Sequence, residues 1–224
     1  MTNREIEIIL TSKIFKGFDE ESIHKALHCL KAKLVNYKDS TQIFPLGELT
    51  HFAPLIIDGY IDVSIINNAA NKFIMTRFKS GEVLALANAL SDKPNQIMDI
   101  RTHGTTRVLM LDLSQLINYE INCCPYKMLL MQNLLSILSN KMVKLQNKFQ
   151  ILTQKSLQDK LILLLEQLSS IQNSRTVVLN CTREELAQRV CAERSAVSRQ
   201  LCRMKSEGLI EIDQNKITLL QTDR

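Results

Sequence analysis

The chain has 224 residues, of which 45% are hydrophobic and 23% charged, and its formal net charge is +5. This length can bury one large or two small cores, and the longest apolar runs are too short to span a membrane. Charged residues among the first ten exclude the apolar stretch of a signal peptide. We therefore expect a soluble cytoplasmic protein with no membrane partner.

Charge and turn-forming residues divide the chain near residue 125. Residues 1–125 hold 13 Lys/Arg and 14 Asp/Glu, a net charge of −1, whereas residues 126–224 hold 15 and 9, a net charge of +6. All four prolines and five of the six glycines lie in the first part. The pattern predicts a turn-rich first half and a helical, basic second half that is suited to a polyanion.

The first part begins with helices and continues with short strands. Residues 2–31 are predicted to form two helical pieces broken near Gly17. Seven runs of β-forming residues follow, over residues 34–37, 42–44, 55–57, 60–66, 72–78, 97–102 and 107–111. Strands of this spacing predict an antiparallel roll or barrel, which either holds a small ligand or is purely structural. A short helix is expected over residues 114–119.

A long helix is predicted over residues 125–152, where no proline or glycine follows Pro125. Its apolar residues alternate steps of three and four, which is a heptad seam. The seam comprises Met128, Met131, Leu135, Leu138, Met142, Leu145, Phe149 and Leu152. A second apolar row is formed by Leu130, Leu134 and Ile137. We predict a parallel homodimer through the seam between Met131 and Phe149; the alternative is a helix buried within one chain.

The last part contains the signals of a helix-turn-helix with a wing. An amphipathic helix beginning near residue 157 and a short strand over residues 176–179 come first. Thr182 and Glu185 then form a capping box, which begins a helix. After a short turn, a second helix runs over residues 193–207 and ends at Gly208. Two strands, over residues 209–212 and 216–219, complete a winged helix-turn-helix.

The second helix of this unit carries the chemistry for reading DNA. Its inward stripe is Val197, Leu201 and Met204, and the opposite surface holds Arg194, Ser195, Ser198, Arg199 and Arg203. Arg199 suits guanine O6 and N7, and Ser195 lies one turn earlier on the same face. Phosphate contacts are predicted for Arg203, Arg183 and Thr182. The alternative is a solvated basic helix face.

With these residues the chain resembles the cyclic-AMP receptor protein/fumarate–nitrate regulator (Crp/Fnr) family of bacterial transcription factors. The resemblance runs through Asp58-Gly59-Tyr60-Ile61-Asp62-Val63, the long helix, and the segments 186–187, 194–201 and 208–210. It implies an α+β protein with three parts. These are a β-roll effector domain (cupin-like, a double-stranded β-helix) over 1–124, a dimerisation helix over 125–152 and a winged helix-turn-helix over 153–224.

The resemblance also implies partners and a base contact. In such proteins the position of Arg199 reads guanine. The expected partners are a second copy of the chain, a two-fold symmetric double-stranded DNA operator and, for an activator, RNA polymerase. Many members carry glutamate at the position of Ser195, so the common half-sites of the family are not expected here.

The chain departs from the effector pattern of the family. Cyclic-nucleotide binders hold the phosphate with a Gly-Glu pair and an Arg-Ser/Thr pair, where this chain has Ala85-Leu86 and Gln96-Ile97. Without the arginine, burying a phosphate is costly, so cyclic AMP is not expected. An iron–sulfur cluster is not expected either, because Cys29 stands alone before Cys123. No cofactor is predicted.

Other sensor candidates lack a supporting motif. His24 and His28 have metal-binding spacing, but an exposed pair is the commoner case, and no metal is expected. His51 and His103 are candidate haem ligands without a motif. Adjacent Cys123 and Cys124 are expected to pack, whereas Cys191 and Cys202, which flank the recognition helix, are expected to be buried thiols.

The absence of catalytic motifs argues against an enzyme. The sequence has no Gly-rich phosphate loop, HExxH or GxSxG motif. The alternative to a DNA-binding regulator is a dimeric ligand- or partner-binding module whose winged helix contacts protein. Salt dependence separates the two, because DNA binding weakens steeply with salt.

Overall fold

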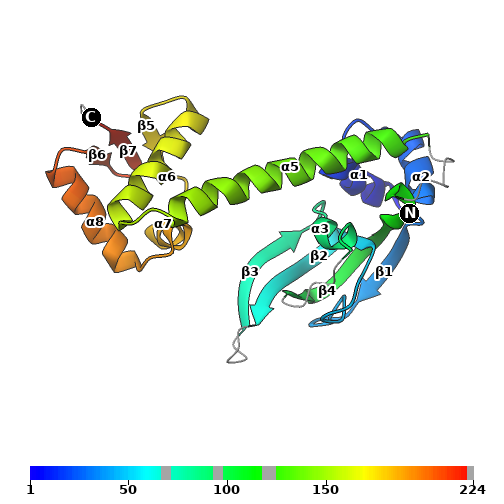
Figure 1. Ribbon diagram of the computed structural model, residues 1–224. Helices are drawn as coiled ribbons and strands as arrows, with labels where there is room; N and C mark the ends of the chain where they lie inside the picture. The colour runs from blue at the N-terminus through cyan, green and yellow to red at the C-terminus, as the bar shows by residue number, and fades with distance from the viewer. Residues whose placement is uncertain (67–71, 93–97, 118–124, 221–224) are drawn as a thin grey trace. The chain divides into compact units, whose positions relative to one another are not determined.

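The computed structural model describes residues 1–66, 72–92, 98–117 and 125–220. The predicted turn at 67–71, Gln96-Ile97 and Cys123-Cys124 lie outside these residues. The chain divides into two compact units, Met1–Ser139 and Asn140–Arg224 (Figure 1). The division falls within helix α5 (Lys127–Leu152), and the predicted functional boundaries at residues 124 and 152 stay predictions. No helix in the described ranges is long and apolar enough to span a membrane.

The first unit begins with three short helical segments, of which the two α-helices are capped by residues next to them in the sequence. They are α1 (Asn3–Thr11), the 3₁₀ turn η1 (Lys13–Phe15) and α2 (Glu20–Cys29). Thr2 and Asp19 each form a capping box with the residue three positions later. The predicted break near Gly17 is confirmed, and this glycine has a φ of +84°.

Four antiparallel strands follow, in the order β1-β4-β2-β3. They are β1 (Lys33–Tyr37), β2 (Phe52–Ile66), β3 (Lys72–Lys79) and β4 (Met98–Asp112). The predicted roll domain is confirmed, but two pairs of predicted strands are single long strands. The strand predicted over residues 42–44 is wrong, because only one isolated bridge, Gln42 to Arg101, forms there.

Strand β2 continues through Asp58-Gly59, although this dipeptide has a composition typical of a turn. The register shifts on both sides of Asp58, so the strand bulges and bends there without ending. Gly59 has a φ of +85°, and a Cβ on it would lie 2.7 Å from the carbonyl oxygen of Thr105 and from Oγ1 of Thr106. Only glycine fits this close approach of β2 to β4.

The sheet of the first unit packs on two hydrophobic clusters. Alternate residues before the bulge of β2 serve different clusters, since Leu55 and Ile57 pack with the helices and Ile56 packs inside the roll. Beyond the bulge, Ile61 also packs inside the roll. The helical cluster also takes in Leu130 and Leu134 of α5. Two short helices, α3 (Leu86–Ala89) and α4 (Ser114–Ile117), lie beside the strands.

The second unit is a small helical domain with a three-stranded sheet, ordered β5-β7-β6. Its elements are α6 (Leu157–Gln172), β5 (Thr176–Val178), α7 (Arg183–Val190), α8 (Arg194–Ser206), β6 (Ile210–Asp213) and β7 (Lys216–Leu219). One cluster of buried residues unites these elements with Ile151 at the end of α5. The predicted order of helix, turn, helix and two-stranded wing is confirmed.

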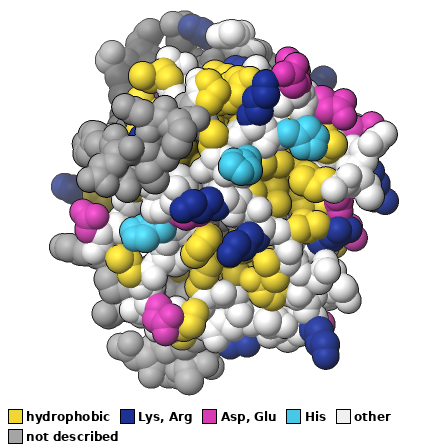
Figure 2. Space-filling view, turned by 90° about the vertical axis from the view of Figure 1, so that its right-hand side faces the viewer, with side chains coloured by type: hydrophobic (Ala, Val, Ile, Leu, Met, Phe, Trp, Pro, Cys, Tyr) yellow, Lys and Arg dark blue, Asp and Glu magenta, His cyan; other side chains and the backbone are white. Residues whose placement is uncertain are grey.

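Histidines and cysteines lie mainly at the surface of the described molecule. Figure 2 shows a face on which histidine, basic and hydrophobic side chains are interspersed. His24 and His28 are exposed on α2, and the described residues contain no group of three potential metal ligands. The expectation that Cys191 and Cys202 are buried is wrong, because both side chains are exposed. Each belongs to a helix end or face that the hydrophobic core of its unit does not cover.

Candidate nucleic-acid interface

Helix α7 is fixed at its first turn by the predicted capping box. The backbone N–H of Glu185 donates to Oγ1 of Thr182 over 3.2 Å, and the N–H of Thr182 donates to Oε2 of Glu185 over 2.7 Å. The backbone N–H and the hydroxyl of Thr182 both donate to this carboxylate and lower the pKa of Glu185, and the backbone N–H has the larger effect. The helix ends at Cys191, which has a φ of +50°.

Helix α8 is oriented by its buried stripe. Val197, Leu201 and Met204 are all at least 98% buried, so the opposite face of the helix must point outward. Gly208, with a φ of +71°, follows the helix and lets the chain turn back into β6. The burial of the stripe therefore decides which side chains a ligand can reach.

The predicted DNA-binding residues of α8 lie on this outward side. Arg194, Ser195, Arg199 and Arg203 are exposed and Ser198 is half-buried. Ser195 and Arg199 are one turn apart, so they share a face near the beginning of the helix. The structure thus brings together a hydroxyl and a guanidinium where a recognition helix meets base edges.

The predicted residues of α7 differ in their access to a ligand. Thr182 is exposed, but its hydroxyl also donates to Glu185 over 3.1 Å. Arg183 is half-buried, and its Nη1 is buried without a hydrogen-bond partner in the described part of the chain. A further exposed cation, Lys216, begins β7 and was not among the predicted site residues, although it lies in the predicted hairpin.

The arginines of α8 differ in their partners. Nε of Arg203 lies 2.7 Å from Oε1 of Glu207, one turn later. Arg194 and Arg199 have no hydrogen bond or ion pair with any described residue. Two guanidinium groups in the first half of the helix are therefore free to donate to an anionic or carbonyl-bearing ligand.

Helix α5 exposes most of the predicted seam. Met131 and Leu135, and further on Met142, Leu145 and Phe149, are 43 to 68% exposed, whereas Leu130 and Leu134 are at most 2% exposed. Leu138 is half-buried and packs against the helical cluster of the first unit. Large apolar side chains in a continuous row at the surface mark an interaction surface.

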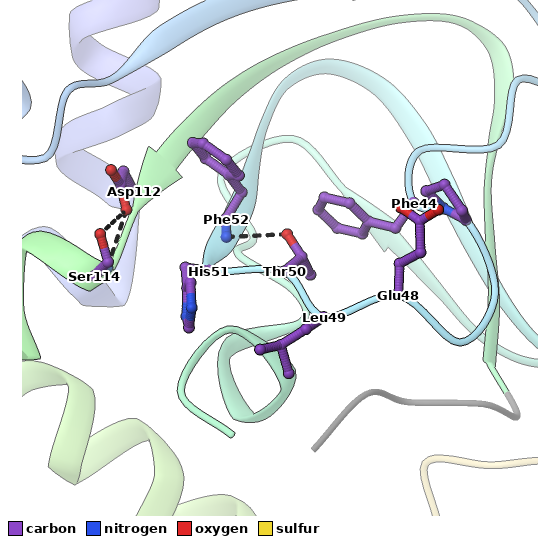
Figure 3. A pocket seen from close by; sticks show the side chains of 9 residues that line it. Phe44, Glu48, Leu49, Thr50, His51, Phe52, Asp112 and Ser114 are labelled. Carbon is purple, nitrogen blue, oxygen red and sulfur yellow. Dashed lines mark hydrogen bonds between the residues drawn. The ribbon is translucent and has the colours of Figure 1, made fainter. Parts of the chain in front are cut away.

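The β-roll has an open cavity of about 350 Å³ beside the beginning of β2 (Figure 3). It is lined by Phe44, Pro45, Glu48, Leu49, Thr50, His51, Phe52, Asp112 and Ser114. His51 Nδ1 lies 3.2 Å from the carbonyl oxygen of Ala89, and because a carbonyl only accepts, Nδ1 carries the proton. Its described lining has two carboxylates and neither lysine nor arginine, so none of these residues offers a phosphate a cationic partner.

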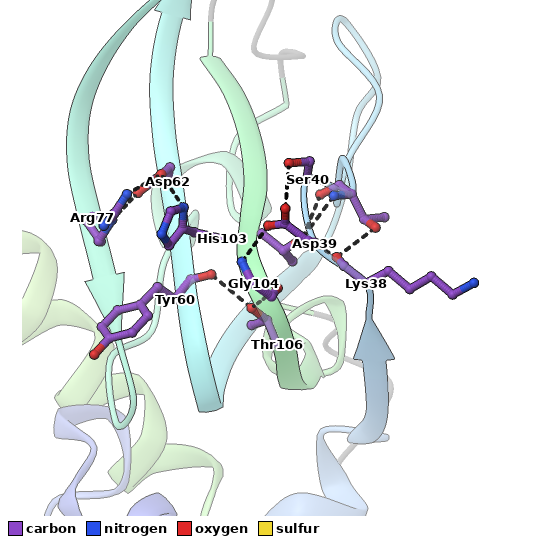
Figure 4. A network of polar contacts seen from close by, with 11 residues as sticks. Lys38, Asp39, Ser40, Tyr60, Asp62, Arg77, His103, Gly104 and Thr106 are labelled. Carbon is purple, nitrogen blue, oxygen red and sulfur yellow. Dashed lines mark hydrogen bonds and ion pairs between the residues drawn. The ribbon is translucent and has the colours of Figure 1, made fainter.

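Three arginines of the sheet, Arg77, Arg101 and Arg107, are paired with carboxylates. Figure 4 shows the pair of Arg77 with Asp62. Arg77 donates to both oxygens of Asp62, over 2.7 and 2.8 Å, and Arg101 lies 2.9 Å from Asp99. In the same network the backbone N–H of Gly104 donates to Asp39, which lowers the pKa of that carboxyl. His103 is 3.9 Å from Asp62.

At the first of the two positions where the family holds a phosphate, Ala85 and Leu86 offer no charged side chain. Ala85 has a φ of +56° and Leu86 is buried in the helical cluster. The second position, Gln96-Ile97, lies outside the described residues. Of the two positions, the described one therefore has no group that could neutralise a phosphate.

The comparisons with known proteins agree with this geometry. Residues 160–224 match the model of the Crp-like helix-turn-helix domain. This part of the chain is a Crp-like helix-turn-helix domain. It contains α7, α8 and the wing, so the predicted resemblance to Crp/Fnr regulators is confirmed there. No curated protein matches the sequence.

Solved structures extend the likeness to the whole fold. The catabolite activator protein of Thermus thermophilus is 17% identical, with a TM-score of 0.56 over 93% of this chain and 94% of its own. The c-di-GMP-responsive global regulator CLP of Xanthomonas campestris is 19% identical, with a TM-score of 0.52 over 91% and 100%. At these identities the likeness establishes the fold. The Crp-like domain thus sits in a chain with the roll, long helix and winged helix of such regulators.

Proposed function

We propose that the protein is a homodimeric, sequence-specific DNA-binding transcription regulator, gated by an effector other than cyclic AMP. The observation that carries the proposal is the exposed, unpaired Arg199 with Ser195 on the outward face of α8, within a Crp-like domain. Arg199 would donate two of its N–H groups to O6 and N7 of guanine, and Ser195 would contact a neighbouring base.

The backbone contacts come from residues around this face. Arg203 at the end of α8 and Thr182 at the beginning of α7 are exposed, and both suit phosphate oxygens. Arg183 would have to turn outward from its half-buried position to join them. These contacts set affinity and register, whereas sequence choice rests on Ser195 and Arg199.

The exposed seam of α5 supports a parallel pairing of two copies. Counting Met142 as heptad position a, Lys141 and Lys148 occupy g positions and Gln146 an e position. In an antiparallel pair the lysines at g would face each other and repel. In a parallel pair Lys141 meets a neutral Gln146, so this direction is favoured.

The dimer is tested by placing charge on the exposed part of the seam. Leu135 and Leu145 are both 67% exposed, so replacing both with Glu should leave each chain folded. We expect monomers by sedimentation and loss of binding to a two-fold operator whose half-sites lie about 34 Å apart. Ile171→Glu, at an apolar residue 74% exposed outside the seam, is the matched control. A double variant that stays dimeric would contradict the seam assignment.

Base reading is tested by selection from random duplexes. Ser195→Glu supplies a carboxylate that accepts from cytosine N4, so the selected half-site should gain a cytosine at one position. Wild type and variant are selected side by side at the same salt concentration. Identical logos for the two would mean that residue 195 does not face the bases. If wild type selects nothing and binds a protein instead, the regulator proposal itself fails.

The effector is expected to lack a phosphate. Neither the described lining of the cavity beside β2 nor the described family position, Ala85-Leu86, offers an arginine or lysine. Cyclic AMP and cyclic GMP should therefore give no binding heat and no shift in melting temperature. Micromolar binding of either would show that the phosphate is held elsewhere. If the regulator is an activator, RNA polymerase is its further partner.

A further inference from the structure

The basic residues of α8 fall into two groups. In the first half of the helix Arg194 and Arg199 have no partner among the described side chains and carbonyls. In the last turn both basic residues have one, since Arg203 pairs with Glu207 over 2.7 Å and Nζ of Lys205 lies 3.5 Å from the carbonyl oxygen of Ile212 in the wing. Of these four basic residues, the acceptors in the described part of the chain therefore engage only the two in the last turn, away from the base-reading turns.

The helix dipole of α8 does not stabilise the carboxylate of Glu207. Glu207 is the C-cap residue of α8, and negative charge at a helix C-terminus opposes the helix dipole. Its side chain is 35% exposed and that of Arg203 68% exposed, so the pair lies at the surface. Exposed pairs of this kind are weak, which means that a phosphate can displace the glutamate.

We infer that Glu207 competes with DNA phosphate for Arg203, and so lowers affinity for DNA of any sequence. This rests on the proposed function, in which Arg203 contacts the backbone. A phosphate that reaches Arg203 must break the pair and approach the carboxylate. Base reading by Ser195 and Arg199 is untouched, because neither residue contacts Glu207.

The test removes the charge of Glu207 and keeps its size. For Glu207→Gln we expect the Kd on both a selected operator and an unrelated duplex to fall by about two- to fivefold, the equivalent of one exposed ion pair. The slope of log affinity against log salt should steepen by up to roughly 0.9 as Arg203 gains a full phosphate contact. The gain should be at least as large on the unrelated duplex as on the operator.

Two further variants make the outcome specific. Glu166→Gln removes the same charge from an exposed position on α6, and should change the Kd by less than Glu207→Gln does. When Arg203 is already replaced by Ala, Glu207→Gln should raise the affinity for DNA by no more than Glu166→Gln does. Melting temperatures of all variants check that the domain stays folded.

The results that overturn the inference differ from those that overturn the proposed function. If Glu207→Gln and Glu166→Gln change the Kd equally, the gain in affinity comes from the net charge alone and not from competition for Arg203. Weaker binding by Glu207→Gln would mean that the carboxylate positions Arg203 for its phosphate. If wild type binds no duplex at any salt concentration, the proposed function fails first.

Discussion

The two units use arginine in opposite ways. In the first unit three arginines of the sheet form ion pairs with carboxylates, with N–O distances of 2.6 to 2.9 Å. The pairs are Arg77 with Asp62, Arg101 with Asp99 and Arg107 with Glu5. In the second unit Arg194 and Arg199 point outward with no partner in the described structure. Charge in the first unit holds strands and helices together. In the second unit Arg203 pairs with Glu207, whereas the guanidinium groups of Arg194 and Arg199 are left for a ligand. Substitutions should therefore affect stability in one unit and binding in the other.

The largest effect is expected at Gly59, where β2 lies close to β4. A Cβ there meets two atoms at 2.7 Å, in a backbone conformation that side chains rarely adopt. Gly59→Ala should lower the free energy of unfolding of the first unit by about 2–5 kcal/mol, from strain and overpacking together. Chemical denaturation with a probe in the roll measures this.

Gly208 provides the control for this backbone argument in the second unit. It also has positive φ, +71°, but nothing lies within 4 Å of its Cβ position. Gly208→Ala should therefore cost only about 1 kcal/mol. Equal losses at the two glycines would show that packing against Thr105 and Thr106 contributes nothing.

A smaller loss of stability is expected when the Glu5–Arg107 pair is broken. The side chain of Glu5 is 5% exposed and accepts from the N–H of Thr2 over 2.8 Å, so it ties α1 to β4. Arg107 is 42% exposed and can turn to water, so Glu5→Ala should cost about 1–3 kcal/mol and not the full cost of a buried unpaired charge. Glu7→Ala, exposed on the same helix, is the control. DNA affinity should not change for either variant.

The converse is expected for Arg199 in the second unit. Arg199→Ala should weaken operator binding by roughly 1–3 kcal/mol and relax the choice at one base pair per half-site. Stability should stay within about 0.5 kcal/mol, because the side chain is exposed and has no hydrogen bond or ion pair with a described residue. Fluorescence titration and thermal melting measure the two quantities. A variant that unfolds more readily than wild type would contradict the division between the units.

How far the sequence predicts each unit depends on how local the decisive contacts are. Helices α7 and α8 were predicted because each signal, from the capping box at Thr182 to Gly208, lies within a few residues of what it determines. The Arg203–Glu207 pair follows from the same i, i+4 logic and could have been predicted. The outward-facing residues of α8 could be predicted from the position of the buried stripe alone.

The roll was predicted less well because its decisive contacts are distant in sequence. Asp58-Gly59 has the composition of a turn, and it becomes a bulge only because β4 approaches it at Thr105 and Thr106. The pairing of Arg107 with Glu5 likewise joins residues about a hundred positions apart. No local pattern indicates such contacts, so the predicted strands were too short and too many.

The smallest expected effect is a pH dependence of α7. The pKa of Glu185 is lowered in the folded protein, first by the backbone N–H of Thr182 and then by its hydroxyl. A carboxyl whose pKa is lower folded than unfolded stabilises the fold above its ordinary pKa and loses that contribution as the pH falls through the lowered value. Glu185→Gln should remove this part of the acid destabilisation, whereas Glu184→Gln, beside it and without a capping contact, should not.

The measurement has to report on the second unit, because Asp19 and Asp39 of the first unit also have lowered pKa values. Amide hydrogen exchange in α7, followed from neutral to acidic pH, separates the units. In wild type the protection of the Leu186 and Ala187 amides should fall as Glu185 is protonated. In Glu185→Gln the protection should already be lower at neutral pH and should hardly change as the pH is lowered. Equal slopes for wild type and Glu185→Gln would mean that the capping carboxylate does not hold the first turn of α7. The helix that supports α8 would then depend on its buried face alone.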